Sequence, residues 1–303
     1  MLSLVHQFYA MGSDCALHLY GGAAKDLEPI AVAAEEEIRR IEARYSRYRD
    51  DSELARINKV AATGGVIDID AETAGLMAYA KACFAKSDGA FDVTSGRLRA
   101  VWNFSVSRLP DRRSIDAVLP FIGLDNVILA NSRLHFRRPG MELDFGGLGK
   151  EYAADRAAEV CLELGMRHGF IDLGGDIRTV GPQPDGLPWR IGIRHPRAAD
   201  RLAAEIALPS GALATSGDYE RFIEVDGRRY CHILDPKTGW PAQGLSSVTV
   251  ISDRCLVAGS LSTAAMLKGH AGAAWLRGLG VRHLVIDRDG NSSGTEPPLT
   301  RYD

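Results

Sequence analysis

The sequence predicts an α+β fold in which helices and strands build one domain. Strand-like runs follow one another in the second half of the chain, whereas helical patterns occupy long separate segments. No linker, repeat or low-complexity block divides the 303 residues. Hydrophobic residues make up 46% and charged residues 25%, the balance of a globular protein with a sizeable core. We therefore expect residues 1–303 to form a single domain.

In the first half of the chain, one strand and several helices precede a pair of strands. The clearest signal is a helix at 25–45, where apolar residues recur at helical spacing and glutamates precede arginines by three or four positions. Asp88-Gly89 is a stop and turn signal for the preceding helix. The expected elements are a strand at 16–20, helices at 25–45, 51–58, 71–87 and 113–119, strands at 126–129 and 134–136, and a helix at 151–164.

The second half is richer in strands. Short apolar runs alternate with turns that contain glycine, and Asp226-Gly227 is a hairpin signal directly after one such run. From Gly290 onward the chain is turn-rich, and we expect 290–303 to be a loose tail. The expected strands are 169–173, 189–194, 204–208, 213–216, 222–225, 247–251 and 283–287, and the expected helices are 256–267 and 271–279.

Composition argues against several functional classes. A net charge of −3 gives no basic surface for nucleic acid, and no run approaches the roughly 18 apolar residues of a membrane span. Five widely spaced cysteines argue against a disulfide framework and a cysteine zinc site, and indicate buried free thiols. The first residues lack the features of an export signal, which indicates the cytoplasm; a periplasmic location stays open if the sequence is a truncated form.

The most informative stretch is glycine-rich and lies at 143–155, where Asp144 precedes Gly147 and Lys150 follows it. Glycines allow the backbone to approach a ligand closely, and a loop that opens into a helix offers amides and carbonyls to a phosphate or a metal ion. The spacing differs from a dinucleotide fingerprint, and Lys150 is not followed by the Ser or Thr of a P-loop. The alternative is a purely structural glycine turn.

Other segments carry weaker signals, each with a structural alternative. Tyr48 could stack on an aromatic ligand or could be a half-buried packing residue. His232 is suited to a general base because its charge changes near neutral pH, but it could equally be a hydrogen-bonded structural histidine. The remaining segments are Met11-Gly12-Ser13, Gly89 to Thr94, Gly174-Gly175-Asp176 and Ala258 to Ala265.

Taken together, these segments resemble the FAD:protein FMN transferase (ApbE) family over almost the whole chain. The matching motifs are F-D-V-T, D-F-G-G-L-G-K-E-Y-A-A-D, L-G-G-D, T-S-G-D-Y-E-R, H-I-L-D-P-K-T-G and L-S-T-A. The resemblance implies a single ApbE-type, T-fold-like α+β domain with mixed or antiparallel sheets and packed helices. It also implies an Mg²⁺-dependent enzyme that transfers FMN from FAD to a threonine or serine hydroxyl of an acceptor protein, such as a redox-complex subunit, and releases AMP.

The resemblance also assigns roles to residues by position. It implies a catalytic base at His232 and a metal site formed by the backbone carbonyl of Gly147 and by Thr263. The FAD contacts that it implies are Met11, Tyr48, Ala90, Phe91, Asp92, Asp144, Lys150 and Leu234.

Two positions depart from the family pattern. Gly259 stands where the family usually has an aspartate that binds the metal, and Glu151 stands where a glycine usually follows the lysine. We expect Gly259→Asp to tighten Mg²⁺ binding, and we hypothesise that Glu151 returns a carboxylate to the site. Two other functions stay open: a FAD-binding accessory protein of a redox complex without transferase activity, which Gly259 favours, and a FAD pyrophosphatase.

Overall fold

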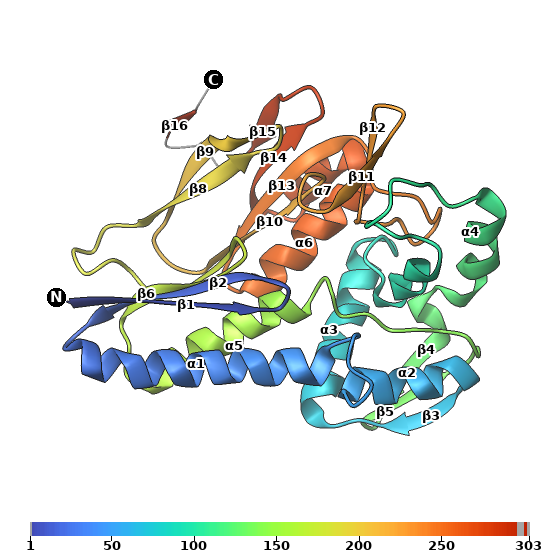
Figure 1. The fold of residues 1–303 in the computed structure, drawn as a ribbon, viewed down its shortest axis with the longest axis horizontal. Helices are drawn as coiled ribbons and strands as arrows, with labels where there is room; N and C mark the ends of the chain where they lie inside the picture. Colours follow the sequence, from blue (N-terminus) through green and yellow to red (C-terminus); the bar gives the residue numbers. More distant parts are fainter. Residues whose placement is uncertain (1, 296–299, 302–303) are drawn as a thin grey trace.

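A computed structural model describes residues 2–295, 300 and 301. Its largest sheet has eight strands, and every strand pair in the described part of the chain is antiparallel (Figure 1). The sheet order is β1 (Leu2–Ala10), β2 (Ser13–Gly21), β6 (His168–Leu173), β7 (Asp176–Gly181), β10 (Ala212–Gly217), β13 (Leu245–Ser252), β14 (Arg282–Asp287) and β15 (Ser292–Gly294).

The pairing of β2 with β6 joins the N-terminal hairpin to the second half of the chain. Leu17 and Leu19 alternate toward the core, where both are fully buried, and this alternation sets the register of the strand. Cys15 pairs with Leu173, and the amide of Gly174 donates to the carbonyl of Asp14 at 3.1 Å. The β1–β2 turn and the β6–β7 turn therefore lie at the same end of the sheet.

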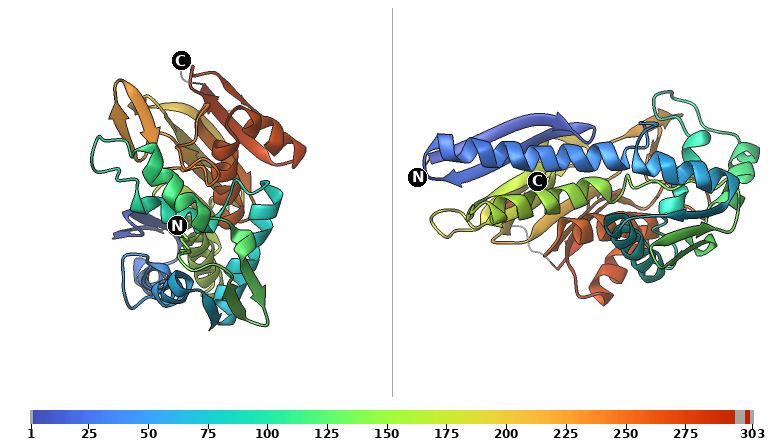
Figure 2. Two further views of the ribbon diagram at one scale, coloured as in Figure 1. Left: turned by 90° about the vertical axis from the view of Figure 1, so that its right-hand side faces the viewer. Right: turned by 90° about the horizontal axis from the view of Figure 1, so that it is seen from below.

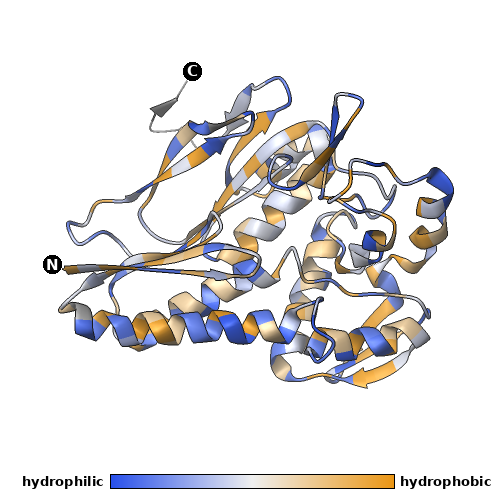
Figure 3. Ribbon diagram, in the orientation of Figure 1, coloured by the Kyte–Doolittle hydropathy of each residue, from blue (hydrophilic) through white to orange (hydrophobic). Residues whose placement is uncertain are grey.

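Three helices pack against this sheet: α1 (Ala24–Tyr45), α5 (Gly149–Glu163) and α6 (Cys255–Lys268). The long helix α1 runs alongside α5 in two views (Figures 1 and 2). The buried residues of α5 are mostly small, including Ala154 and Ala158, which allows neighbouring elements to approach the helix closely. Apolar and polar stretches alternate along α1, as a helix with one buried face requires (Figure 3).

Most of the other helices form a smaller layer beyond the end of α1, and further strands lie along the edge of the molecule (Figure 1). The helices of this layer are α2 (Glu53–Thr63), α3 (Ala71–Lys86) and α4 (Arg112–Val118), and its 3₁₀ segments are η1 (Val93–Ala100), η2 (Leu119–Phe121) and η3 (Leu124–Asn126). The segment η4 (Gly269–Ala271) and helix α7 (Gly272–Gly278) lie beside α6, and α7 also contacts β14. The strands are β3 (Gly65–Asp68), β5 (Arg133–Phe136) and β4 (Val127–Ala130) in one sheet, β16 (Thr300–Arg301), β9 (Ala198–Leu208) and β8 (Trp189–His195) in another, and the hairpin β11 (Phe222–Val225) and β12 (Arg228–Cys231).

The expected helices are all present, whereas six of the described strands were not predicted. The predicted helix at 51–58 continues to Thr63, and β9 starts six residues before its predicted start. The missed strands are β1, β3, β7, β12, β15 and β16. β1 is an edge strand whose exposed face carries the apolar residues Val5 and Tyr9, so apolar residues occur on both faces and its sequence lacks a polar–apolar alternation.

The C-terminal segment differs from the expected loose tail. Within 290–303, β15 pairs with β14, and β16 pairs with β9, so the described part of this segment is held by two sheets. Turn-rich composition hides such short strands because the backbone alone supplies their pairing. Residues 296–299, 302 and 303 lie outside the described residues.

The five cysteines are all free, and all but Cys83 are fully buried. Burial raises the pKa of each of these thiols, which keeps them protonated and unreactive at neutral pH. Among the helices of residues 2–295, none combines the length and the apolar character needed to cross a bilayer.

Candidate functional site

A groove of about 2190 Å³ runs between the end of the large sheet and the smaller layer. It is larger than the roughly 300–1,000 Å³ of most small-molecule sites, so it has room for an extended ligand. All the residues to which the sequence assigns a role line it: Met11, Tyr48, Ala90, Phe91, Asp92, Asp144, Gly147, Lys150, His232, Leu234 and Thr263. The structure thus brings together positions from both halves of the chain.

Met11 occupies the turn between β1 and β2 in a left-handed conformation, with φ of 56°. Its amide donates to Glu42 Oε1 at 2.6 Å, which ties the turn to the last part of α1. Ser13 lies against Gly174, where a Cβ would be 2.8 Å from the Ser13 side chain. A glycine is therefore needed at the β6–β7 turn for the two turns to meet at the groove.

Tyr48 lies at the groove with 74% of its surface exposed. The guanidinium of Arg47 donates to the Tyr48 hydroxyl at 2.8 Å, lies 5.0 Å from the ring centroid and also forms an ion pair with Asp144. This exposure excludes the alternative of a packing tyrosine. The held and exposed ring can stack on a planar ligand.

The loop from Ala90 to Asp92 is fixed by hydrogen bonds and packing of its buried side chains. Asp92 is 7% exposed and caps η1: its Oδ1 accepts from the Thr94 amide at 2.7 Å, and its Oδ2 accepts from the Leu124 amide at 3.1 Å. Phe91 is buried and packs near Gly147, where a Cβ would be 3.4 Å from the ring. Because both carboxylate oxygens already have partners, Asp92 shapes the loop that borders the groove.

The glycine-rich loop opens directly into α5. The Asp144 amide donates to the carbonyl of Val93 at 2.8 Å, and Asp144 Oδ1 accepts from the Gly146 amide at 2.8 Å, so the loop is fixed before the helix begins. Among the described residues no side chain caps the N-terminus of α5, although the amide of Gly149 itself donates to the carbonyl of Phe145 at 2.7 Å. Bare amides at the start of a helix favour a bound anion, such as a phosphate.

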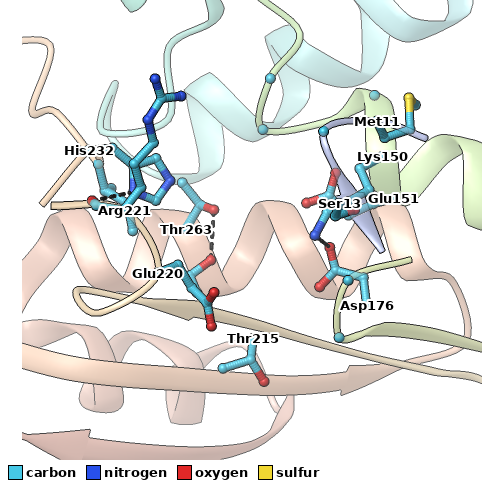
Figure 4. A pocket seen from close by; sticks show the side chains of 18 of the residues that line it. Met11, Ser13, Lys150, Glu151, Asp176, Thr215, Glu220, Arg221, His232 and Thr263 are labelled. Carbon is cyan, nitrogen blue, oxygen red and sulfur yellow. Dashed lines mark hydrogen bonds and ion pairs between the residues drawn. The ribbon is translucent and has the colours of Figure 1, made fainter. Parts of the chain in front are cut away.

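Lys150 forms an ion pair with Asp176, with 2.9 Å between Nζ and Oδ2, and both residues line the groove (Figure 4). Burial lowers the pKa of the Lys150 ammonium, but the carboxylates of Asp176 and Glu151 outweigh burial and raise that pKa above its usual value. Lys150 therefore stays charged. No role was assigned to Asp176 from the sequence, although the motif L-G-G-D contained the signal: a carboxylate directly after a glycine turn.

Glu151 and Gly259, the two positions that depart from the family pattern, are in contact. Glu151 is 7% exposed, and its Oε2 has no hydrogen-bond partner among the described residues. A Cβ at Gly259 would lie 2.6 Å from Glu151 Oε1 and 2.8 Å from Cδ. Burial, together with the neighbouring Asp176 carboxylate, raises the pKa of Glu151 to about 7. The structure revises one expectation: Gly259→Asp alone would collide with Glu151.

Thr263 and His232 lie at the other end of the view in Figure 4. Thr263 is on α6, and its hydroxyl is 2.9 Å from the hydroxyl of Ser216 on β10. The Nδ1 of His232 donates to the carbonyl of Arg221 at 3.1 Å, which leaves Nε2 as the basic nitrogen of the neutral ring. Although the ring is open to the groove, desolvation by the surrounding walls, together with nearby cations including Arg221, lowers its pKa.

Within residues 2–295, no group of three or more histidine, cysteine, aspartate and glutamate side chains could hold a metal ion by itself. The oxygen donors at hand are the carbonyl of Gly147, the hydroxyl of Thr263 and the carboxylate of Glu151, all on the groove. Such a set suits Mg²⁺, which keeps several waters and commonly binds through one or two carboxylates and substrate phosphates.

Sequence comparison assigns this arrangement to a known family. A family model described as the ApbE family matches residues 11–285. The FAD:protein FMN transferase of Haemophilus influenzae is 32% identical over 240 residues, which are 76% of this chain and 69% of that protein. The FAD:protein FMN transferase of Vibrio cholerae is 34% identical over 230 residues, 74% of this chain and 69% of that protein.

Solved structures give the same assignment. The ApbE protein of Thermotoga maritima superposes with a TM-score of 0.89 at 35% identity, covering 97% of each chain. The apo form of the flavinyl transferase ApbE of Pseudomonas stutzeri superposes with a TM-score of 0.83 at 32% identity, covering 97% of this chain and 95% of that one. The expected ApbE-type fold is confirmed, and the chain belongs to the ApbE family.

Proposed function

We propose that this protein transfers FMN from FAD to a threonine or serine hydroxyl of an acceptor protein and releases AMP. The observation that carries the proposal is the groove itself. It joins an uncapped helix N-terminus and the charged Lys150 to His232, whose Nε2 is the basic nitrogen. The relatives named FAD:protein FMN transferase support the same activity.

The two ends of the groove have complementary chemistry for this reaction. The bare amides of α5 and the ammonium of Lys150 suit the negative charge of a pyrophosphate. The exposed ring of Tyr48, fixed by Arg47, suits stacking on one of the two flat rings of FAD. The lining of the groove is thus polar where phosphates would lie and aromatic where a ring would lie.

We propose that a divalent cation, Mg²⁺ in the cell, binds with the FAD pyrophosphate next to the Gly147 carbonyl and the Thr263 hydroxyl. The residues present fit such an ion, because they supply oxygen donors and include the buried Oε2 of Glu151, which has no hydrogen-bond partner in the described residues. A cation held by these residues would neutralise charge on the pyrophosphate.

The transfer step exchanges one phosphorus–oxygen bond for another. The acceptor hydroxyl oxygen forms a bond to the phosphorus of the FMN half, and the bond from that phosphorus to the bridging oxygen breaks. AMP leaves with the bridging oxygen. The hydroxyl proton passes to Nε2 of His232, whose lowered pKa keeps the ring neutral and able to accept it at pH 7.

We propose that the acceptor is a subunit of a redox complex. The experiment combines the purified protein with FAD, with and without Mg²⁺, and a domain that carries a candidate threonine. Mass spectrometry detects the FMN adduct, and chromatography detects AMP. Mg²⁺-dependent adduct and AMP in equal amounts are the expected result.

Other outcomes distinguish the alternatives. AMP without an adduct, with several acceptor domains, would indicate a FAD pyrophosphatase. FAD recovered intact would indicate a FAD-binding accessory protein. His232→Ala is expected to abolish most of the transfer while FAD still binds, and His135→Ala, on the exposed face of β5, serves as the matched control.

A further inference from the structure

We infer that Glu151 supplies the carboxylate of the metal site, from helix α5, and that Gly259 on helix α6 is the opening into which that side chain reaches. The inference rests on the proposed function, because the metal is expected to bind together with FAD. It assigns a metal ligand to a position where the family resemblance implies a glycine.

The first argument is an oxygen atom without a partner on the buried side chain of Glu151. Only 7% of Glu151 is exposed, and its Oε2 has no hydrogen-bond partner in the part of the chain that the structure describes. A buried carboxylate oxygen without a partner is costly, and unsatisfied atoms of this kind call for an explanation. A divalent cation would supply the missing partner.

The second argument is the surrounding charge. Two buried carboxylates, Glu151 and Asp176, lie near a single ammonium, that of Lys150, with which Asp176 is paired at 2.9 Å. When both carboxylates are ionised, these three side chains together carry one negative charge in excess. A bound cation compensates this excess, and Figure 4 shows the three side chains gathered at one end of the groove.

The third argument is that the side chain of Glu151 on α5 fills the space that a side chain at position 259 on α6 would need. Oε1 of Glu151 would be 2.6 Å from a Cβ at position 259, so the carboxylate takes the space at the root of any larger side chain there. Thr263 follows Gly259 by four residues on α6, which places both positions on one face of the helix, about one turn apart. The Glu151 carboxylate thus enters the site beside the turn of α6 that carries Thr263.

The test measures metal binding directly, with Mn²⁺ as the probe. The full-length protein is saturated with FAD without acceptor, Mn²⁺ is titrated, and free Mn²⁺ is followed by its electron paramagnetic resonance signal. FAD affinity without metal is measured separately by fluorescence. Glu151→Gln is expected to weaken Mn²⁺ binding at least about 10-fold, because even groups that only orient metal ligands contribute about 10–100-fold.

The control and the rescue use the same two helices. Glu163→Gln removes an equal charge from the exposed last turn of α5 and is expected to leave Mn²⁺ binding unchanged. Gly259→Asp alone is expected to lose Mn²⁺ binding because of the collision with Glu151. The double variant Glu151→Gly with Gly259→Asp is expected to bind Mn²⁺ again, with the carboxylate now on α6.

Two results would overturn the inference: FAD-loaded Glu151→Gln that binds Mn²⁺ as tightly as wild type, or a double variant that folds but does not regain binding. If Glu151→Gln loses thermal stability along with binding, the double variant decides between the two explanations. A missing FMN adduct alongside Mn²⁺ binding that depends on Glu151 would overturn the proposed transfer and leave this assignment standing.

Discussion

Asp155 controls how helices α5 and α6 meet, and Asp155→Ala is the perturbation that we develop first. Its carboxylate accepts from the amides of Cys255 and Leu256 at 2.9 and 3.0 Å, at the start of α6, where no side chain of α6 itself provides a cap. The same carboxylate pairs with Arg178 at 3.1 Å. Asp155 is one turn beyond Glu151 on α5, so it also fixes the distance between Glu151 and Gly259.

The magnitude follows from these contacts. Loss of a helix cap costs about 1 kcal/mol. Arg178, with a side chain only 15% exposed, would lose its carboxylate, and breaking a buried pair costs about 3–5 kcal/mol. Burial raises the pKa of Asp155 more than its hydrogen bonds lower it, so removal of the carboxylate also relieves a desolvation cost. We expect a net loss of about 3 kcal/mol.

Differential scanning calorimetry without ligand measures this loss. With an unfolding entropy of about 2.1 cal/mol/K per residue over 303 residues, 3 kcal/mol corresponds to a decrease in Tm of about 5 °C. Glu159→Ala is the control, because Glu159 is one turn further along α5 and pairs with Arg254 at the surface; we expect a decrease below about 2 °C. If Asp155→Ala and the wild-type protein had the same Tm, the reasoning would be refuted.

Three further predictions concern the groove. Tyr48→Ala should weaken FAD binding with no change in Tm, because the ring is 74% exposed; a fall in Tm without a change in FAD dissociation constant would identify a packing residue. Lys150→Met should weaken FAD binding and lower Tm, whereas Lys150→Met with Asp176→Asn should recover Tm but not FAD affinity, since the second change removes the unpaired carboxylate. The transfer rate should fall with decreasing pH only below the usual histidine pKa of 6.5, because the pKa of His232 is lowered and the neutral base persists to lower pH; an apparent pKa above 6.5 would contradict this role.

The elements predicted well are those in which apolar residues repeat at the spacing of one buried face. Helix α1 matches its predicted span within one residue at its start, because Leu27, Ala31 and Ile38 repeat at helical spacing. β1 was missed because apolar residues occur on both of its faces, and β12 was missed because this short, largely polar strand is stabilised by backbone pairing with β11. The pairing of β2 with β6 could not be predicted, since it joins segments separated by five helices and three strands.

The residues of the site could be named from motif resemblance, but their interactions could not. The sequence places Lys150 and Glu151 next to each other, yet the structure gives one an ionic partner in Asp176 and leaves the other facing Gly259. Asp92 shows the reverse: a residue assigned to ligand contact has both oxygens engaged by Thr94 and Leu124. These roles depend on distances between residues that are far apart in the sequence, and such distances cannot be deduced from the spacing of residues along the chain.

The long-range pairing of β2 has a consequence for synthesis of the chain. The β1–β2 hairpin and α1 leave the ribosome before β6, the partner of the open edge of β2, which follows only after residues 22–167 have been made. At roughly 5–20 residues per second this interval is on the order of ten seconds. During it the nascent chain presents an unpaired strand, and Glu42, at the end of α1, can already hold the turn at Met11. The N-terminal segment therefore stays only partly folded until β6 has been synthesised and pairs with β2.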